Sequence, residues 1–176
     1  RVAQICRVND LEWSEIDPER AANEYAADLL LPLSMFQPLT ERMAMTFSTV
    51  ESLAEDFQTS LTATAIRLVQ HGAYPAMLIW STSNHRKSFL RPRSIPEEIW
   101  PLKELHSDTA ASRILKGEHL PHNPIEIRAD KWIAQDNAFK YYLVEDSRLI
   151  QRDTVLTIIW WKDERQLLEL DPEEDG

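Results

Sequence analysis

The pattern of apolar and polar residues divides the chain into a helical first part and a sheet-forming second part. Up to about residue 72, apolar residues recur with the period of an α-helix, and short apolar runs separated by polar turns follow. We therefore expect an α+β fold. Its predicted parts are a helical segment over 1–72, an α+β domain with a small antiparallel sheet over 73–165, and an acidic tail over 166–176.

Four helices are predicted in the first part. Their ranges are 18–31, 34–45 with an interruption near Pro38, 48–57 and 61–70. The last two are joined by a tight turn. Ser48 and Ser60 are expected as N-caps, Glu51 would complete a capping box, and Gly72 would end the second helix.

Five strands and one further helix are predicted in the second part. The strands are 76–80, 86–90, 126–133, 139–147 and 154–161, and the helix is 107–117. The run 154–161 is almost continuously apolar, so we expect it at the centre of the sheet. Trp160 and Trp161 would point to opposite faces of that strand, which leaves one of them available to line a groove.

One carboxylate stands on the apolar side of the first predicted helix. Glu19 lies three residues before an apolar stripe made of Ala22, Tyr25, Ala26, Leu29 and Leu30. A carboxylate that faces a core needs a cation, a metal or a hydrogen-bond donor as its partner. A first-turn acid is also favoured by the helix dipole whatever the function, and Asp17 and Pro18 suit the start of a helix. Helix physics alone leaves both interpretations open.

The residues around Glu19 add a family resemblance. The pattern Glu-x-x-Ala-Asn-x-(Phe/Tyr)-Ala-Ala-x-Leu-Leu-(Met/Leu)-Pro, met here from Glu19 to Pro32, resembles the signature helix of the ImmA/IrrE zinc metallo-endopeptidases. In that family a His-Glu-x-x-His helix supplies two zinc ligands and the general base. The resemblance implies that Glu19 is the third zinc ligand and that Asn23, one turn further on, orients a ligand or the substrate.

The sequence also departs from this family. None of its 176 residues belongs to a His-Glu-x-x-His motif, and only eighteen residues precede Glu19. We therefore expect the chain to be the downstream part of a longer protein, with two metal ligands and the base upstream of Arg1. As written, it would not hold a catalytic zinc with the usual three protein ligands.

The resemblance extends to later segments and implies a function. The predicted pair 48–57 and 61–70 is similar to the segment that follows the signature helix in the family, and the last part resembles the C-terminal region described in some members as similar to a GAF sensory domain. The intact enzyme would be a cytoplasmic regulator of stress response and transcription. Its substrate would be a helix-turn-helix repressor, cleaved with the help of zinc.

Direct DNA binding is not favoured by the residue types in the helix-turn-helix-like pair. Arg67 is the only cation in either helix, and the chain carries a net charge of −10. A helix that reads DNA needs exposed cationic or amide side chains at its start. We expect this pair to have a structural role.

Composition narrows the remaining possibilities. The single cysteine, Cys6, rules out an internal disulfide and is typical of a reducing compartment such as the cytoplasm. No apolar run is long enough to span a bilayer.

Two charged clusters have competing interpretations. Glu118, His119 and His122 have metal-ligand chemistry, although Pro121 makes a polar loop the simpler interpretation. A basic cluster either binds an anion or an acidic partner, or forms a charged hairpin rim. It comprises Arg86, Lys87, Arg91 and Arg93.

Two classes of function remain. The first is the zinc metallo-endopeptidase. The second is a non-catalytic sensor or interaction module that binds a small effector or a protein through its C-terminal domain. The oligomeric state is not indicated by the sequence.

Overall fold

The computed structural model of the protein describes residues 22, 29–83 and 85–170. The helices in this part are α2 (Leu33–Thr40), α3 (Phe47–Phe57), α4 (Leu61–His71), α5 (Ala110–Leu115) and α6 (Arg165–Leu170), with 3-10 turns η1 (Ala129–Lys131) and η2 (Ala138–Lys140). The strands are β1 (Ala76–Thr82), β2 (His85–Leu90), β3 (Ile125–Arg128), β4 (Tyr142–Gln151) and β5 (Thr154–Trp160). None of the helices in this part of the chain has the length and hydropathy needed to cross a bilayer.

The strands form one antiparallel sheet in the order β2-β1-β5-β4-β3. The predicted α+β class with an antiparallel sheet is therefore confirmed. Strand β5 lies in the middle of the sheet, as its apolar sequence predicted, and all 7 of its residues are buried. Alternate side chains of β5 enter two different cores, because successive residues of a strand point to opposite faces.

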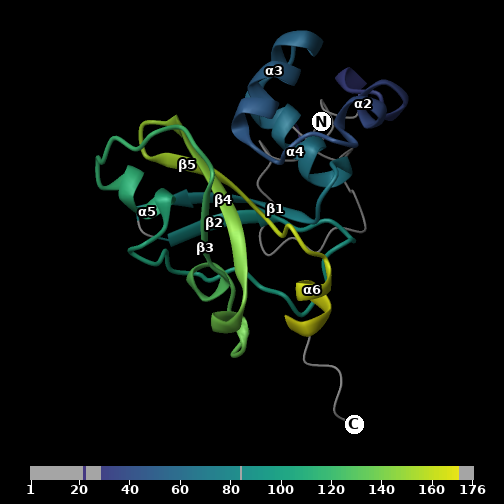
Figure 1. Cartoon of the computed structure of the whole chain (residues 1–176). Coiled ribbons are helices and arrows are strands. Elements are labelled where there is room, and N and C mark those ends of the chain that lie inside the picture. Colours follow the sequence, from purple (N-terminus) through teal and green to yellow (C-terminus); the bar gives the residue numbers. More distant parts are fainter. Residues whose placement is uncertain (1–21, 23–28, 84, 171–176) are drawn as a thin grey trace, which may run out of the picture.

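Each face of the sheet carries its own layer, so the fold has three layers (Figure 1). Helices α3 and α4 cover one face, where Phe47 and Leu68 share a core with Leu156. Helix α5, the 3-10 turns and α6 cover the other face. The two predicted domains thus share a hydrophobic core. Trp160 and Trp161 are both core residues, one in each layer.

The helical part begins differently from the prediction. Most of the expected helix 18–31 lies outside the described residues. Of its predicted core-facing stripe, Ala22, Leu29 and Leu30 are described, and all three are exposed, so this part of the prediction is wrong. The carbonyl of Pro32 accepts bonds from the Met35 and Phe36 N–H groups, so Pro32 opens α2. Helix α2 contains Pro38 and ends at Thr40, short of the predicted residue 45.

The N-cap of α3 is Thr46, and the prediction of Ser48 is wrong. The Thr46 hydroxyl accepts a hydrogen bond from the Thr49 N–H, whereas Ser48 lies inside the helix. Glu51 consequently forms no capping box. The predictions for α4 are confirmed, because Ser60 caps its start and Gly72 follows its end.

Several elements of the second part also differ from their predicted ranges. Strand β4 spans Tyr142–Gln151 instead of 139–147. Helix α5 is capped by Thr109 and ends before Gly117. Strand β3 gives way at Ala129 to the 3-10 turn η1, and the buried Trp132 follows this turn. The start of the expected acidic tail is helical. Helix α6 buries Leu167 and Leu170 in the core on this face of the sheet, and the removal of these apolar side chains from water stabilises the helix.

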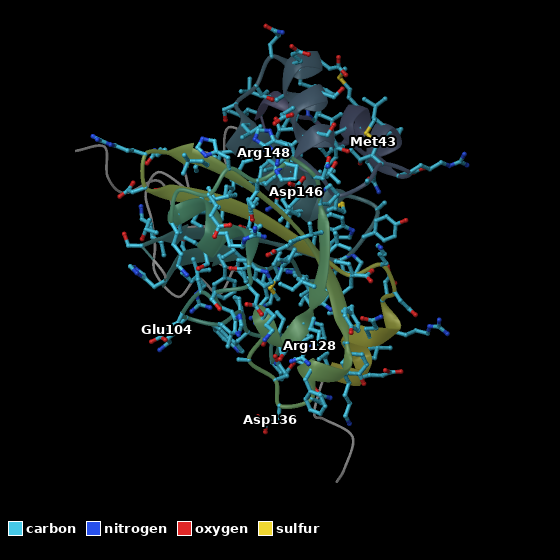
Figure 2. All side chains as sticks on the ribbon, turned by 60° about the vertical axis from the view of Figure 1, so that its left-hand side comes forward. Met43, Glu104, Arg128, Asp136, Asp146 and Arg148 are labelled. Carbon is cyan, nitrogen blue, oxygen red and sulfur yellow. The ribbon has the colours of Figure 1, made fainter. Side chains whose placement is uncertain are left out.

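A buried carboxylate on β4 joins the helical layer to the sheet. The Phe47 N–H, which has no partner within α3 because it lies in the first turn, donates to Oδ2 of Asp146 at 2.7 Å. The guanidinium of Arg148, two residues along the same strand, donates to the other carboxylate oxygen at 2.8 Å. Figure 2 shows the two side chains next to each other beside the α3–α4 layer.

Arg148 extends this contact to the surface. Its Nε lies 3.3 Å from Oε1 of Glu51 on α3, and its guanidinium stacks over the Phe47 ring at 5.4 Å. Asp146 is 2% exposed and Glu51 is 52% exposed at its side chain, so the same cation has one buried and one solvated partner.

This difference in burial gives a prediction. Replacing Asp146 by Asn should lower the free energy of unfolding by about 3 kcal/mol, because a buried cation loses its buried counter-charge. The matched control, Glu51→Gln, should cost less than about 1 kcal/mol, because exposed pairs are screened by water. Urea denaturation of both variants measures the two values. Equal losses would contradict the assignment of Asp146 as the principal partner.

Candidate functional site

The two residues predicted for the metal site, Glu19 and Asn23, lie outside the described residues. Within the described part of the chain, no group of three or more His, Cys, Asp and Glu side chains is placed to hold a metal ion.

The last residues of the motif, from Leu29 to Pro32, are described by the structure, and Leu31 is hydrogen-bonded to α4. The carbonyl oxygen of Leu31 accepts a hydrogen bond from Nε of Arg67 on α4 at 2.8 Å. Arg67 is only 4% exposed, and Leu31 is buried in the same core as α3 and α4. The only cation of the helix pair thus binds a carbonyl inside the protein, where a DNA-reading residue would have to be exposed.

The described residues form a groove on the other face, between α5 and β4. It has a volume of about 400 Å³, within the usual range for binding pockets. Its walls come from α5, the loop 117–123, the first residue of β3, and residues 146–149 of β4. The loop can turn away from α5 because Gly117 adopts a φ of +88°, a conformation that favours glycine.

A row of polar side chains lies beneath α5 beside this groove. The Ser147 hydroxyl, which lines the groove, is 2.8 Å from the hydroxyl of Thr157 on β5. Glu145 lies on the same face of β4, two residues earlier. Because Ser147 is held by another hydroxyl group, the arrangement favours binding over nucleophilic catalysis.

Glu145 is fully buried and has two N–H partners. Its Oε1 accepts a bond of 2.7 Å from the Ala110 N–H at the start of α5, and its Oε2 accepts a bond from the Trp132 indole N–H. Burial raises the pKa of the Glu145 carboxyl from 4.5 to about 7, although both N–H donors lower it. This carboxyl therefore changes charge near neutral pH, directly behind a wall of the groove.

The histidine cluster of the sequence analysis forms part of the groove rim. His119 and His122 lie in the exposed loop and line the groove, and Glu118 binds Arg113 on α5 at 2.8 Å. These residues are a polar loop, the simpler of the two interpretations.

Two arginines of the predicted basic cluster support the chain internally. Arg86 donates to the carbonyl of Pro101 at 2.6 Å, and Arg91 donates to the carbonyls of Glu97 and Ile99. Their guanidinium groups also stack on Phe89 and Trp100. Both arginines thus hold the segment after β2 against the sheet.

Glu145 and Asp146 were not among the residues predicted from the sequence to form a site. A signal was present: Glu145-Asp146-Ser147-Arg148 is a polar run beside the apolar strand β5. A strand next to the centre of a sheet is covered on both faces, so polar residues on it must find partners inside the protein. Their partners, Phe47 and Ala110, lie far away in sequence.

Comparisons with known proteins do not assign the chain. No protein-family profile matches it, and no curated protein matches it with significant similarity.

The titration of Glu145 gives a second prediction. Its folded-state pKa of about 7 lies above the ordinary 4.5, so its stabilising contribution is complete below pH 4.5 and is lost as the pH rises to about 7. The free energy of unfolding, relative to Glu145→Gln, should fall by on the order of 3 kcal/mol across this interval.

Denaturation at a series of pH values measures this slope. The control is Glu126→Gln on the neighbouring strand β3, where the side chain is 57% exposed and should leave the wild-type slope unchanged. If Glu145→Gln kept the same slope as the wild type, Glu145 would not be the titrating group.

Proposed function

We propose that this chain is the downstream part of a zinc-dependent metallo-endopeptidase that resembles the ImmA/IrrE regulators and cleaves a helix-turn-helix repressor. The observation that carries the proposal is the motif from Glu19 to Pro32. It combines a carboxylate on an apolar stripe with the Ala-Asn and Leu-Leu positions of the family's signature helix.

The described helices are consistent with this assignment. Leu31, the last leucine of the motif, is buried and its carbonyl is bound by Arg67 of α4, whereas Leu29 and Leu30 are 63% and 53% exposed. The helix pair that follows the motif packs on the sheet. A helix that ended in this core would be held rigidly, which a metal ligand requires.

A role in DNA reading is disfavoured by the burial of α4. Seven consecutive residues of this helix, from Ala63 to Val69, are buried. A recognition helix must present one face to the major groove. This burial, with a net charge of −10, supports a structural role for the helix pair.

The proposal assigns zinc to residues outside the described part. Glu19 would be the third ligand, and Asn23 would position a ligand or the substrate. When bound, the metal would polarise the scissile carbonyl and activate water. The other two ligands and the base would come from a His-Glu-x-x-His helix encoded upstream of Arg1.

A second candidate function is favoured by the groove between α5 and β4. A sensor or interaction module needs a concave site with a few polar groups and apolar walls. The groove offers Ile114, Leu120 and Leu149 as apolar walls, and Ser147 and Asn123 as polar groups. This module would be the GAF-like part suggested by the family resemblance. It could operate with or without an active peptidase.

The peptidase proposal predicts the metal content of the intact protein. Changing Glu19 to Gln should reduce bound zinc at least about tenfold, because a neutral amide is a much weaker zinc ligand than a carboxylate. Metal analysis after dialysis measures the stoichiometry. The matched control is Glu24→Gln, which lies off the apolar stripe in the same predicted helix and should keep full zinc content.

Two results would contradict the proposal. One is unchanged zinc in Glu19→Gln. The other is the absence of His-Glu-x-x-His from the sequence encoded upstream of Arg1, which would leave the interaction module as the better account.

A further inference from the structure

Strand β4 is much longer than the edge strand that pairs with it. Strand β4 has 10 residues and β3 has 4. The pairing runs from Tyr142, opposite Arg128, to Glu145, opposite Ile125. Among the described residues, no strand pairs with this edge of β4 beyond Glu145, although its other edge continues to pair with β5 as far as Gln151.

The groove lies along this free edge. It is lined by Asp146, Ser147, Arg148 and Leu149, four consecutive residues of β4. Because successive side chains of a strand point to opposite faces, a pocket above one face would be lined mainly by alternate residues. Contact with consecutive residues indicates that the groove meets the strand from its side. Ile125, the first residue of β3, stands at one end of it.

The loop 117–123 forms the opposite wall without taking the place of a strand. Its backbone hydrogen bonds include Glu118 N–H to the Arg113 carbonyl and Asn123 N–H to the Pro121 carbonyl. Among the described residues, no backbone bond joins this loop to residues 146–149. The space between loop and strand is therefore bordered by a strand edge. The Ser147 carbonyl on β4 already accepts a bond of 3.1 Å from the Arg148 guanidinium, and the other peptide groups along this edge can pair with another chain.

We propose that this groove binds an extended segment of a partner protein as an added β-strand, in line with β3 and antiparallel to β4. Backbone hydrogen bonds to residues 146–149 supply affinity, and the groove walls select the side chains. The inference rests on the second candidate function, the interaction module, and gives that module a class of partner.

The walls define the chemistry of the bound segment. Side chains on the α5 side meet Ile114, Leu120 and Leu149, of which Leu149 is 54% exposed despite being apolar. A bound strand would therefore place apolar residues at alternate positions. The charged side chains of the lining balance one another, because Arg113 is paired with Glu118 at 2.8 Å and Arg148 with Asp146 at 2.8 Å, so the walls select apolar residues rather than charge.

The first experiment uses the complete 176-residue chain as bait for a displayed library of random short peptides. Enriched sequences should alternate apolar and polar residues. A synthetic copy of an enriched peptide should slow amide exchange at residues in 146–149 and not at β2, the opposite edge of the sheet. A library without enriched sequences, or protection confined to other elements, would overturn the proposal.

The second experiment separates backbone pairing from side-chain contact. The same peptide is N-methylated at alternate amides, in two versions that cover the two sets of N–H groups. One version should bind at least about tenfold more weakly, because its edge-facing donors are lost, and the other should bind nearly as well as the parent. Equal binding by both versions would exclude strand addition.

A protein variant locates the site independently. Leu149→Glu should weaken binding of the parent peptide at least about tenfold, since it replaces an apolar contact by a charged side chain. The control, Leu168→Glu on α6, changes a leucine that is 73% exposed and should bind like the wild type. Equal affinities in the two variants would contradict the site. Zinc content plays no part in these assays, so their failure is distinguishable from failure of the peptidase proposal.

Discussion

Two adjacent buried carboxylates on β4 determine how the three layers are joined. Glu145 and Asp146 point to opposite faces of the sheet, and each accepts a hydrogen bond from the N-terminal backbone of a helix. Asp146 holds α3, and Glu145 holds α5 together with Trp132. Burying two neighbouring acids costs free energy, so the folded state requires the hydrogen-bond donors of α3 and α5 that satisfy them. The strand that carries them therefore binds a helix on each face of the sheet.

The same strand connects the architecture to the candidate site. Helix α5 is fixed over one face of β4 by Glu145, and the groove opens where α5 and the loop 117–123 stand apart from the free edge. The position of α5 thus sets the width of the groove. Because the pKa of Glu145 is raised by burial to about 7, the charge behind this wall changes within the neutral pH range. The peptidase proposal concerns the other end of the chain, where Arg67 holds the last turn of the motif.

Sequence patterns correctly predicted the elements whose side chains match their surroundings, with apolar residues where both faces are buried. Strand β5 was placed at the centre of the sheet because its residues are apolar on both faces. The end of β4 was predicted at Ser147 although the strand continues to Gln151, because the mostly polar sequence from Arg148 to Asp153 resembles a connection and gives no sign that Arg148 is buried. The N-cap of α3 was predicted at Ser48 but is Thr46. The first N–H of the helix, that of Phe47, donates to the carboxylate of Asp146, which lies 99 residues away in the sequence. Such long-range hydrogen bonds leave no local pattern. Glu19 and Asn23 remain predictions.

Amide hydrogen exchange tests most directly whether each acid holds its own layer. In Glu145→Gln, the amides of α5 should exchange faster while those of α3 keep their protection, because only the α5 contact is weakened. In Asp146→Asn, the amides of α3 should exchange faster and those of α5 should not. If both variants lost protection at the same set of amides, the two carboxylates would not act on separate layers, and the account of β4 as their junction would be wrong.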